Sequence, residues 1–89
     1  MVTIEFAPAL QRHVTCPAQT AAAATLQQAL ETVFAKVPSL RGYVVDDQGA
    51  VRKHVAVFIN GELVHDRRNL ARPLAAGDQV YVAQALSGG

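Results

Sequence analysis

One amphipathic helix, with extended segments on both sides of it, limits what this chain can fold into. Over residues 26–37 the apolar side chains recur at spacings of three and four, which is typical of a helix lying with one face on a sheet. These side chains are Leu26, Ala29, Leu30, Val33, Phe34 and Val37. Thr25 and Gln28 form a capping box at its start, in which Gln28 is expected to reach back to the amide of Thr25. Pro38 ends the helix, because the residue before a proline is disfavoured in helical conformation.

The segment before the helix predicts a hairpin. Val2, Ile4 and Phe6 alternate with polar residues, as in a half-buried strand. Residues 12–16 are expected to return as the second strand. Pro17 would close that strand, because proline has no amide hydrogen to donate to a ladder.

The segment after the helix predicts further strands separated by turns. Strands are expected at residues 43–45, 54–59, 62–64 and 79–84, and turns at residues 46–49, 60–61 and 77–78. The dipeptide Asn60-Gly61 is the strongest two-residue hairpin signal, because both positions tolerate a positive φ. In the last strand Val80 and Val82 are expected to point inward.

This order of elements favours an α+β fold with one main helix across one face of a mixed four- or five-stranded sheet. Such an arrangement is the β-grasp fold, in which the first and last strands pair in parallel at the centre of the sheet. Residues 1–84 are predicted to form this domain. Residues 85–89 are predicted to form a flexible tail, because two terminal glycines cost entropy to order and supply no packing.

Composition excludes several classes of function. Eight basic and seven acidic residues nearly cancel, so charge does not indicate binding to nucleic acid or to a membrane. The longest apolar stretch is far shorter than the roughly 20 residues that cross a bilayer, and no basic leader is present. We therefore expect a cytoplasmic protein. A charged fraction of only 17% favours exposed apolar surface and hence a protein partner.

Metal and nucleotide sites are not expected in the chain itself. His13, His54 and His65 lack the spacing of metal ligands, and a single cysteine, Cys16, cannot form an intramolecular disulfide. Cys16 is interpreted as a small packed residue rather than a reactive thiol. No glycine-rich phosphate loop opens the helix, so no nucleotide cofactor is expected to bind to this chain.

The ending Ala85-Leu86-Ser87-Gly88-Gly89 completes a recognisable combination of motifs. Together with Val-Ala-Val-Phe-Ile-Asn-Gly at residues 55–61 and the alternating segment at residues 74–82, it resembles the ubiquitin-like sulfur carriers of the MoaD/ThiS type. These include the small subunit of molybdopterin synthase and the thiamine and cysteine-biosynthesis carriers. The resemblance is plainest over residues 52–89 and looser before them.

The resemblance implies that the chain is a carrier and not an enzyme. An activating enzyme related to ubiquitin-activating enzymes would use ATP to adenylate Gly89, and a persulfide donor would supply sulfur for a thiocarboxylate. Leu86, Ser87 and Gly88 would thread into the partner. The acceptor would be an enzyme such as the molybdopterin synthase large subunit or a pyridoxal-phosphate cysteine synthase, with the molybdopterin and cysteine types favoured.

A docking surface is expected on the face of the sheet away from the helix. If Val55, Val57 and Ile59 face the helix, then Phe58, Tyr81 and Ala83 lie on the opposite face, where an aromatic pair could anchor an interface. The sequence-adjacent Arg67 and Arg68, with Arg72, are interpreted as a solvated charged loop, the alternative being ion pairs with a partner.

Two other functions remain open from the sequence. The same activated glycine could be joined to lysines of target proteins, as in a ubiquitin-like modifier. Alternatively, the domain could be a non-covalent interaction module whose tail has no role.

Overall fold

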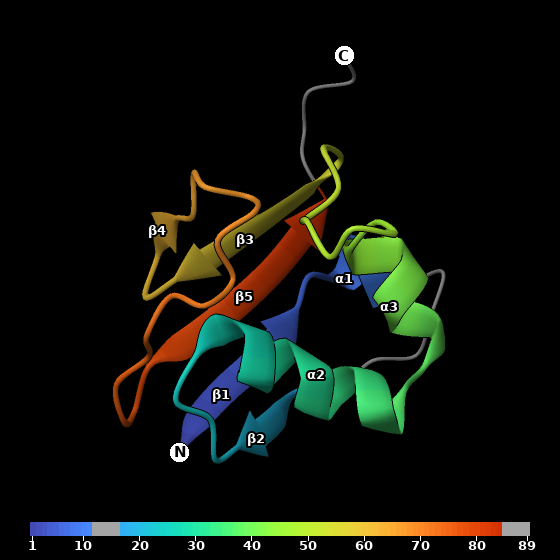
Figure 1. The fold of residues 1–89 in the computed structure, drawn as a ribbon. Helices are drawn as coiled ribbons and strands as arrows, with labels where there is room; N and C mark the ends of the chain where they lie inside the picture. Colours follow the sequence, from blue (N-terminus) through green and yellow to red (C-terminus); the bar gives the residue numbers. More distant parts are fainter. Residues whose placement is uncertain (12–16, 85–89) are drawn as a thin grey trace.

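The computed structural model describes residues 1–11 and 17–84, and its centre is a five-stranded mixed sheet (Figure 1). The elements in chain order are β1 (Val2–Phe6), α1 (Pro8–Gln11), β2 (Gln19–Ala21), α2 (Leu26–Lys36), α3 (Ser39–Val44), β3 (Val55–Ile59), β4 (Glu62–Leu63) and β5 (Gln79–Gln84). The strand order is β2-β1-β5-β3-β4, with β1 and β5 parallel and the other neighbours antiparallel. This is the predicted β-grasp arrangement.

Helix α2 starts where the capping residues predict. Thr25 is extended, with φ −135° and ψ 161°, and its Oγ1 accepts a hydrogen bond from the Gln28 amide at 3.2 Å. The Gln28 side chain reaches back one residue further than expected, since its Oε1 accepts from the amide of Ala24 at 2.8 Å. The helix ends at Lys36, one residue before the predicted end, and the Val37 amide donates to the Val33 carbonyl at 2.9 Å.

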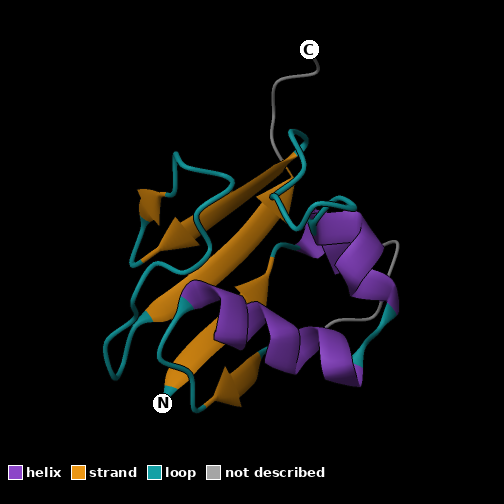
Figure 2. Ribbon diagram, in the orientation of Figure 1, coloured by secondary structure: helices purple, strands orange, loops and turns teal. Residues whose placement is uncertain are grey.

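The core lies between α2 and one face of the sheet (Figure 2). Alternate residues of β1, β3 and β5 are buried on this face, as the period-two pattern predicts. They are Val2, Ile4, Phe6, Val55, Val57, Ile59, Val80 and Val82. Leu26, Leu30 and Val33 of α2 are fully buried against them, so the helix contributes its whole apolar stripe to the core.

The N-terminal hairpin is correct in topology, but its second strand lies later than predicted. β2 pairs antiparallel with β1 in a register that places Val2 opposite Ala21 and Ile4 opposite Gln19. The chain first forms the short helix α1 after β1, so it needs more residues before it returns. Pro17 therefore precedes the strand instead of closing it, and residues 12–16 lie outside the described residues.

The strand predicted at residues 43–45 is wrong, because most of that segment belongs to helix α3. Leu40 and Val44 are fully buried and stand four residues apart, so a helical turn puts both of them into the core. Only Val45 is extended, and it forms an isolated bridge with Val51. Burial has overridden the β-propensity of the valines.

The turn predicted at residues 46–49 is confirmed. Asp46 Oδ1 accepts from the amides of Gln48 at 2.9 Å and Ala50 at 3.0 Å, and Gly49 has φ 82°. These two backbone hydrogen bonds hold the pKa of the Asp46 carboxyl below its usual value. Asn60 and Gly61 also take positive φ, 52° and 85°, as the hairpin between β3 and β4 requires.

Candidate functional site

Strand β5 carries the chain out of the middle of the sheet. It is hydrogen-bonded to β1 on one side and β3 on the other, and its last residue, Gln84, lies opposite Val55. The predicted reactive and threading residues are Leu86, Ser87, Gly88 and Gly89, and all of them lie outside the described residues. The structure thus describes the place from which the tail starts.

The face of the sheet away from α2 carries the predicted aromatic pair. Phe58 and Tyr81 are direct neighbours across β3 and β5, with ring centroids 6.4 Å apart and ring planes tilted by 53°. This distance is typical of a favourable aromatic contact. Ala83 is half-buried on the same face and pairs with Ala56. The sequence pattern therefore placed Phe58, Tyr81 and Ala83 on the correct face.

Leu63 belongs to the same surface, although the sequence analysis did not include it. It lies opposite Phe58 across the β3–β4 hairpin, and 40% of it is exposed, compared with 39% of Tyr81. The two-residue Asn60-Gly61 turn fixes the register of this hairpin, so the pairing of Leu63 with Phe58 could have been predicted from the sequence. We call these five residues, Ala56, Phe58, Leu63, Tyr81 and Ala83, the aromatic patch.

A second surface feature lies at the start of β3, close to Gln84. Eight residues line an open hollow of about 470 Å³, which we call the cationic hollow: Asp46, Ala50, Val51, Arg52, Lys53, His54, Arg67 and Arg68. Arg52, Lys53 and Arg68 are exposed, whereas the neighbouring Arg67 is half-buried. Positive side chains outnumber the single carboxylate, so the hollow favours a negatively charged partner surface.

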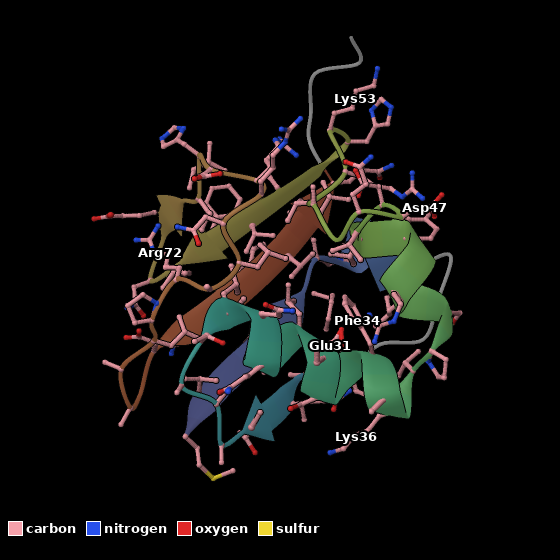
Figure 3. All side chains as sticks on the ribbon, in the orientation of Figure 1. Glu31, Phe34, Lys36, Asp47, Lys53 and Arg72 are labelled. Carbon is pink, nitrogen blue, oxygen red and sulfur yellow. The ribbon has the colours of Figure 1, made fainter. Side chains whose placement is uncertain are left out.

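The three arginines considered together in the sequence have separate roles. Arg67 holds the backbone at the start of β3, because its Nη1 donates to the carbonyl oxygens of Arg52 and, at 2.7 Å, Val55. Arg68 lines the hollow together with Asp46. Arg72 is not part of the hollow and lies well away from Lys53 (Figure 3). The sequence interpretation of one solvated arginine loop is therefore wrong for Arg67, whose guanidinium is bound within the protein.

A small pocket lies at the end of β5 between α1, α3 and the start of β3. Its volume is about 280 Å³, and it is lined by Leu10, Gly42, Tyr43, Arg52, His54, Val55 and Gln84. Ligand pockets usually have volumes of roughly 300–1,000 Å³, so this pocket is slightly smaller than that range.

The other residues considered from the sequence do not assemble into a site. Among residues 1–11 and 17–84, no three His, Cys, Asp or Glu side chains come together in a way that could hold a metal ion. His13 and Cys16 lie outside the described residues. In the described part of the chain, no helix has the length and apolar character needed to cross a membrane.

Comparison with known proteins decides the family. Residues 9–89 match the model of the ThiS family. The chain belongs to the ThiS family. The predicted resemblance to ubiquitin-like sulfur carriers is confirmed by this match, which includes the C-terminal residues that carry the Gly-Gly ending.

This ThiS-family chain is similar to several solved structures over nearly its full length. SAMP1 from Haloferax volcanii is 25% identical, with 99% of this chain and 98% of that chain covered and a TM-score of 0.75. CysO from Mycobacterium tuberculosis is 24% identical, with 97% and 100% covered and a TM-score of 0.80. The BexX/CysO complex from Amycolatopsis orientalis gives 20% identity, full coverage of both chains and a TM-score of 0.80. A search of curated proteins gave no match.

Proposed function

We propose that this protein is a sulfur carrier whose C-terminal Gly89 is adenylated and then converted to a thiocarboxylate. The observation that carries the proposal is the position of β5. The middle strand of a ThiS-family domain ends at Gln84 at one end of the sheet, and five residues that finish in Gly88-Gly89 follow it. We place the reaction in the cytoplasm, where ATP is supplied.

The chemistry explains why the chain needs an activating enzyme. A carboxylate is a poor acyl donor, because oxide would have to leave. An activating enzyme would join Gly89 to AMP from ATP and release pyrophosphate, and the terminal sulfur of a persulfide donor would then displace AMP. A thiol would cleave the resulting acyl disulfide and leave the thiocarboxylate on Gly89. The carrier supplies no general base, metal or cofactor to these steps.

The aromatic patch is proposed as the docking surface for these partners. It follows β3 and β5 from Leu63 to the Ala56–Ala83 pair, and Ala83 is one residue before the end of β5. A partner bound there would lie next to the start of the tail. Aromatic side chains are the usual anchors of protein interfaces, and the exposed Arg52, Lys53 and Arg68 would add attraction to carboxylates at the rim.

An enzyme that accepts the sulfur is the second partner we propose. Two structural neighbours were solved as complexes, BexX/CysO and subunits 1 and 2 of the Helicobacter pylori molybdopterin-converting factor. By analogy, we expect an acceptor such as the molybdopterin synthase large subunit or a pyridoxal-phosphate cysteine synthase.

A modifier function is the second candidate, because SAMP1 is described as a small archaeal modifier protein. In this case, the activated Gly89 would form isopeptide bonds with lysines of target proteins. Both functions need adenylation of Gly89. They differ in the product, which is a thiocarboxylate for the carrier and an isopeptide conjugate for the modifier.

The test uses the full chain with a purified activating enzyme, ATP and a persulfide donor. A carrier is expected to release pyrophosphate and to gain the mass of one oxygen-to-sulfur exchange at its C-terminus. A variant that lacks Gly89 should do neither, although it should remain folded. If ATP and the activating enzyme leave Gly89 unchanged, the proposal is wrong. In cells, conjugates resistant to reducing agents would instead favour the modifier.

A further inference from the structure

Lys53 is placed beside the point at which the tail leaves the sheet. Val55 pairs with Gln84, and the Val55 amide donates to the Arg52 carbonyl at 3.0 Å, so residues 52–55 form a turn. Lys53 stands at the exposed tip of this turn. Within the described residues, its ammonium group makes no hydrogen bond or ion pair.

The other two amines of the protein, Lys36 and the N-terminus, do not lie beside the end of β5. The chain has two lysines and one N-terminal amine. Lys36 is the last residue of α2 and lies at the opposite side of the molecule from Lys53 (Figure 3). The Met1 carbonyl accepts from the Gly77 amide at 2.9 Å, which places the N-terminus near the beginning of β5 and not near its end.

The length of the tail allows Gly89 to reach Lys53. Five residues follow Gln84, and they can span at most about 17 Å. Residues that pair across antiparallel strands are roughly 5 Å apart, and Lys53 is two residues from Val55, so its Cα lies within about 12 Å of that of Gln84. The flexible stem of a lysine shortens the remaining gap. A connection of only five residues corresponds to an effective concentration on the order of millimolar.

The charge around Lys53 also favours the encounter. Arg52 and Arg68 are exposed side chains of the cationic hollow that Lys53 helps to line. An acyl adenylate carries a negative phosphate next to the reactive carbonyl. The guanidinium groups therefore attract the activated end of the tail towards the amine.

We propose that Lys53 is a self-acylation site, at which the activated Gly89 of the same chain forms an isopeptide bond. This inference rests on the activation of Gly89 proposed above. The unprotonated Nζ attacks the carbonyl carbon of the acyl adenylate, a C–N bond forms, and the C–O bond to the phosphate breaks. AMP leaves with the electron pair, and the proton of the amine passes to water. No oxidant or reductant is needed.

Self-acylation would compete with sulfur transfer for the activated chain. The cyclised product has no free C-terminal carboxylate and can no longer carry sulfur. A productive partner must therefore cover the turn at residues 52–55 or deliver sulfur faster than Lys53 reacts. The turn adjoins the docking surface proposed above, so one partner could do both.

The test supplies the activation without any partner enzyme. The full chain is prepared with Gly89 as an alkyl thioester, by thiol cleavage of an intein fusion, and kept dilute at mildly alkaline pH with excess thiol. Attack by Lys53 then releases the alkyl thiol. We expect a monomer lighter than the free acid by one water, with Lys53 linked to Gly89 in peptide mapping and a rate independent of protein concentration.

Matched variants identify the nucleophile. Lys53→Arg keeps the positive charge and should give only hydrolysis, whereas Lys36→Arg should cyclise like the wild type. Hydrolysis alone in the wild type, a link at Lys36 or Met1, or formation of dimers only would overturn the proposal. Because the thioester replaces adenylation, each of these outcomes is independent of whether an activating enzyme acts on Gly89.

Discussion

The side-chain amide of Asn60 donates a hydrogen bond to the carboxylate of Asp78, with Nδ2 and Oδ1 2.9 Å apart. Asn60 Oδ1 in turn accepts from the Gln79 amide at 2.9 Å, and Asp78 Oδ2 accepts from the Ala75 amide at 2.8 Å. The two turns lie 18 residues apart in the sequence, and these contacts join the β3–β4 hairpin to the beginning of β5. These hydrogen bonds hold the beginning of β5 at Gln79. The opposite end of the strand, Gln84, is where the tail begins.

The first prediction concerns the acid stability that Asp78 provides. The hydrogen bonds from the Asn60 side chain and the Ala75 amide lower the pKa of Asp78 from its usual value of 3.8. A carboxyl group with a lowered folded-state pKa stabilises the fold above its unfolded pKa, and this contribution is lost as the pH falls through the folded-state value. Urea unfolding from neutral pH to about pH 2 should show a smaller acid-dependent loss for Asp78→Asn than for the wild type.

The control for this experiment is Asp47→Asn, which removes one acidic group without touching the Asn60–Asp78 pair. It corrects for the change in net charge. If Asp78→Asn and the wild type lose stability in parallel below pH 3.8, the Asn60–Asp78 hydrogen bond does not contribute as described.

The local elements could be predicted from the sequence because their signals are local. The stripe and cap of α2, the Asn60-Gly61 turn and the alternation of β5 each occupy a short run of residues. The errors have a different origin. The helix α1 displaced β2 from its predicted position, and α3 formed because Leu40 and Val44 meet a core built from distant segments. No window of sequence contains that information.

In the candidate site, too, features with a local sequence signal could be predicted, and features that depend on distant segments could not. The alternation of apolar residues correctly predicted that Phe58 and Tyr81 lie on the face away from α2, because successive side chains of a strand point to opposite faces of the sheet. The different surroundings of Arg67 and Arg72 depend on how the loop after β4 folds back on residues 52–55. The alternation of residues along a strand carries no information about that loop. The roles of Gly88 and Gly89 remain predictions.

The second prediction separates Arg67 from its neighbour Arg68. Arg67→Ala removes two hydrogen bonds to backbone carbonyls at the start of β3, so the free energy of unfolding should fall by about 1.5–3 kcal/mol. Arg68→Ala removes an exposed guanidinium and should change it by less than about 0.5 kcal/mol. Chemical unfolding followed by circular dichroism checks both values. Equal losses in the two variants would contradict the structural role of Arg67.

The third prediction tests the aromatic patch as a docking surface. Tyr81→Ala removes the most exposed ring of the patch and should weaken binding to the activating enzyme at least about tenfold. The loss of the ring contact with Phe58 should destabilise the fold by only about 0.5–1.5 kcal/mol. Calorimetric titration measures the affinity. Lys36→Ala, on α2 and away from the patch, should bind like the wild type. Unchanged binding of Tyr81→Ala would place the interface elsewhere.

The fourth prediction separates the tail from the fold. Among the described residues, Val82 is the last one with a buried side chain, so we expect Gly88→Val to leave the melting temperature unchanged. In the proposed reaction, the end of the chain must thread into the active site of the activating enzyme. A β-branched side chain next to Gly89 would add bulk there and restrict the backbone, so kcat/KM for pyrophosphate release should fall at least about 100-fold, or roughly 2.7 kcal/mol. Gly42→Ala is the control for activity, because a Cβ at Gly42 meets no atom within 4 Å and should leave pyrophosphate release unchanged. Because Gly42 lies within α3, alanine there should keep or raise the melting temperature. Normal pyrophosphate release by Gly88→Val would show that the end of the chain does not enter a confined site, and the requirement for glycine would then need another cause.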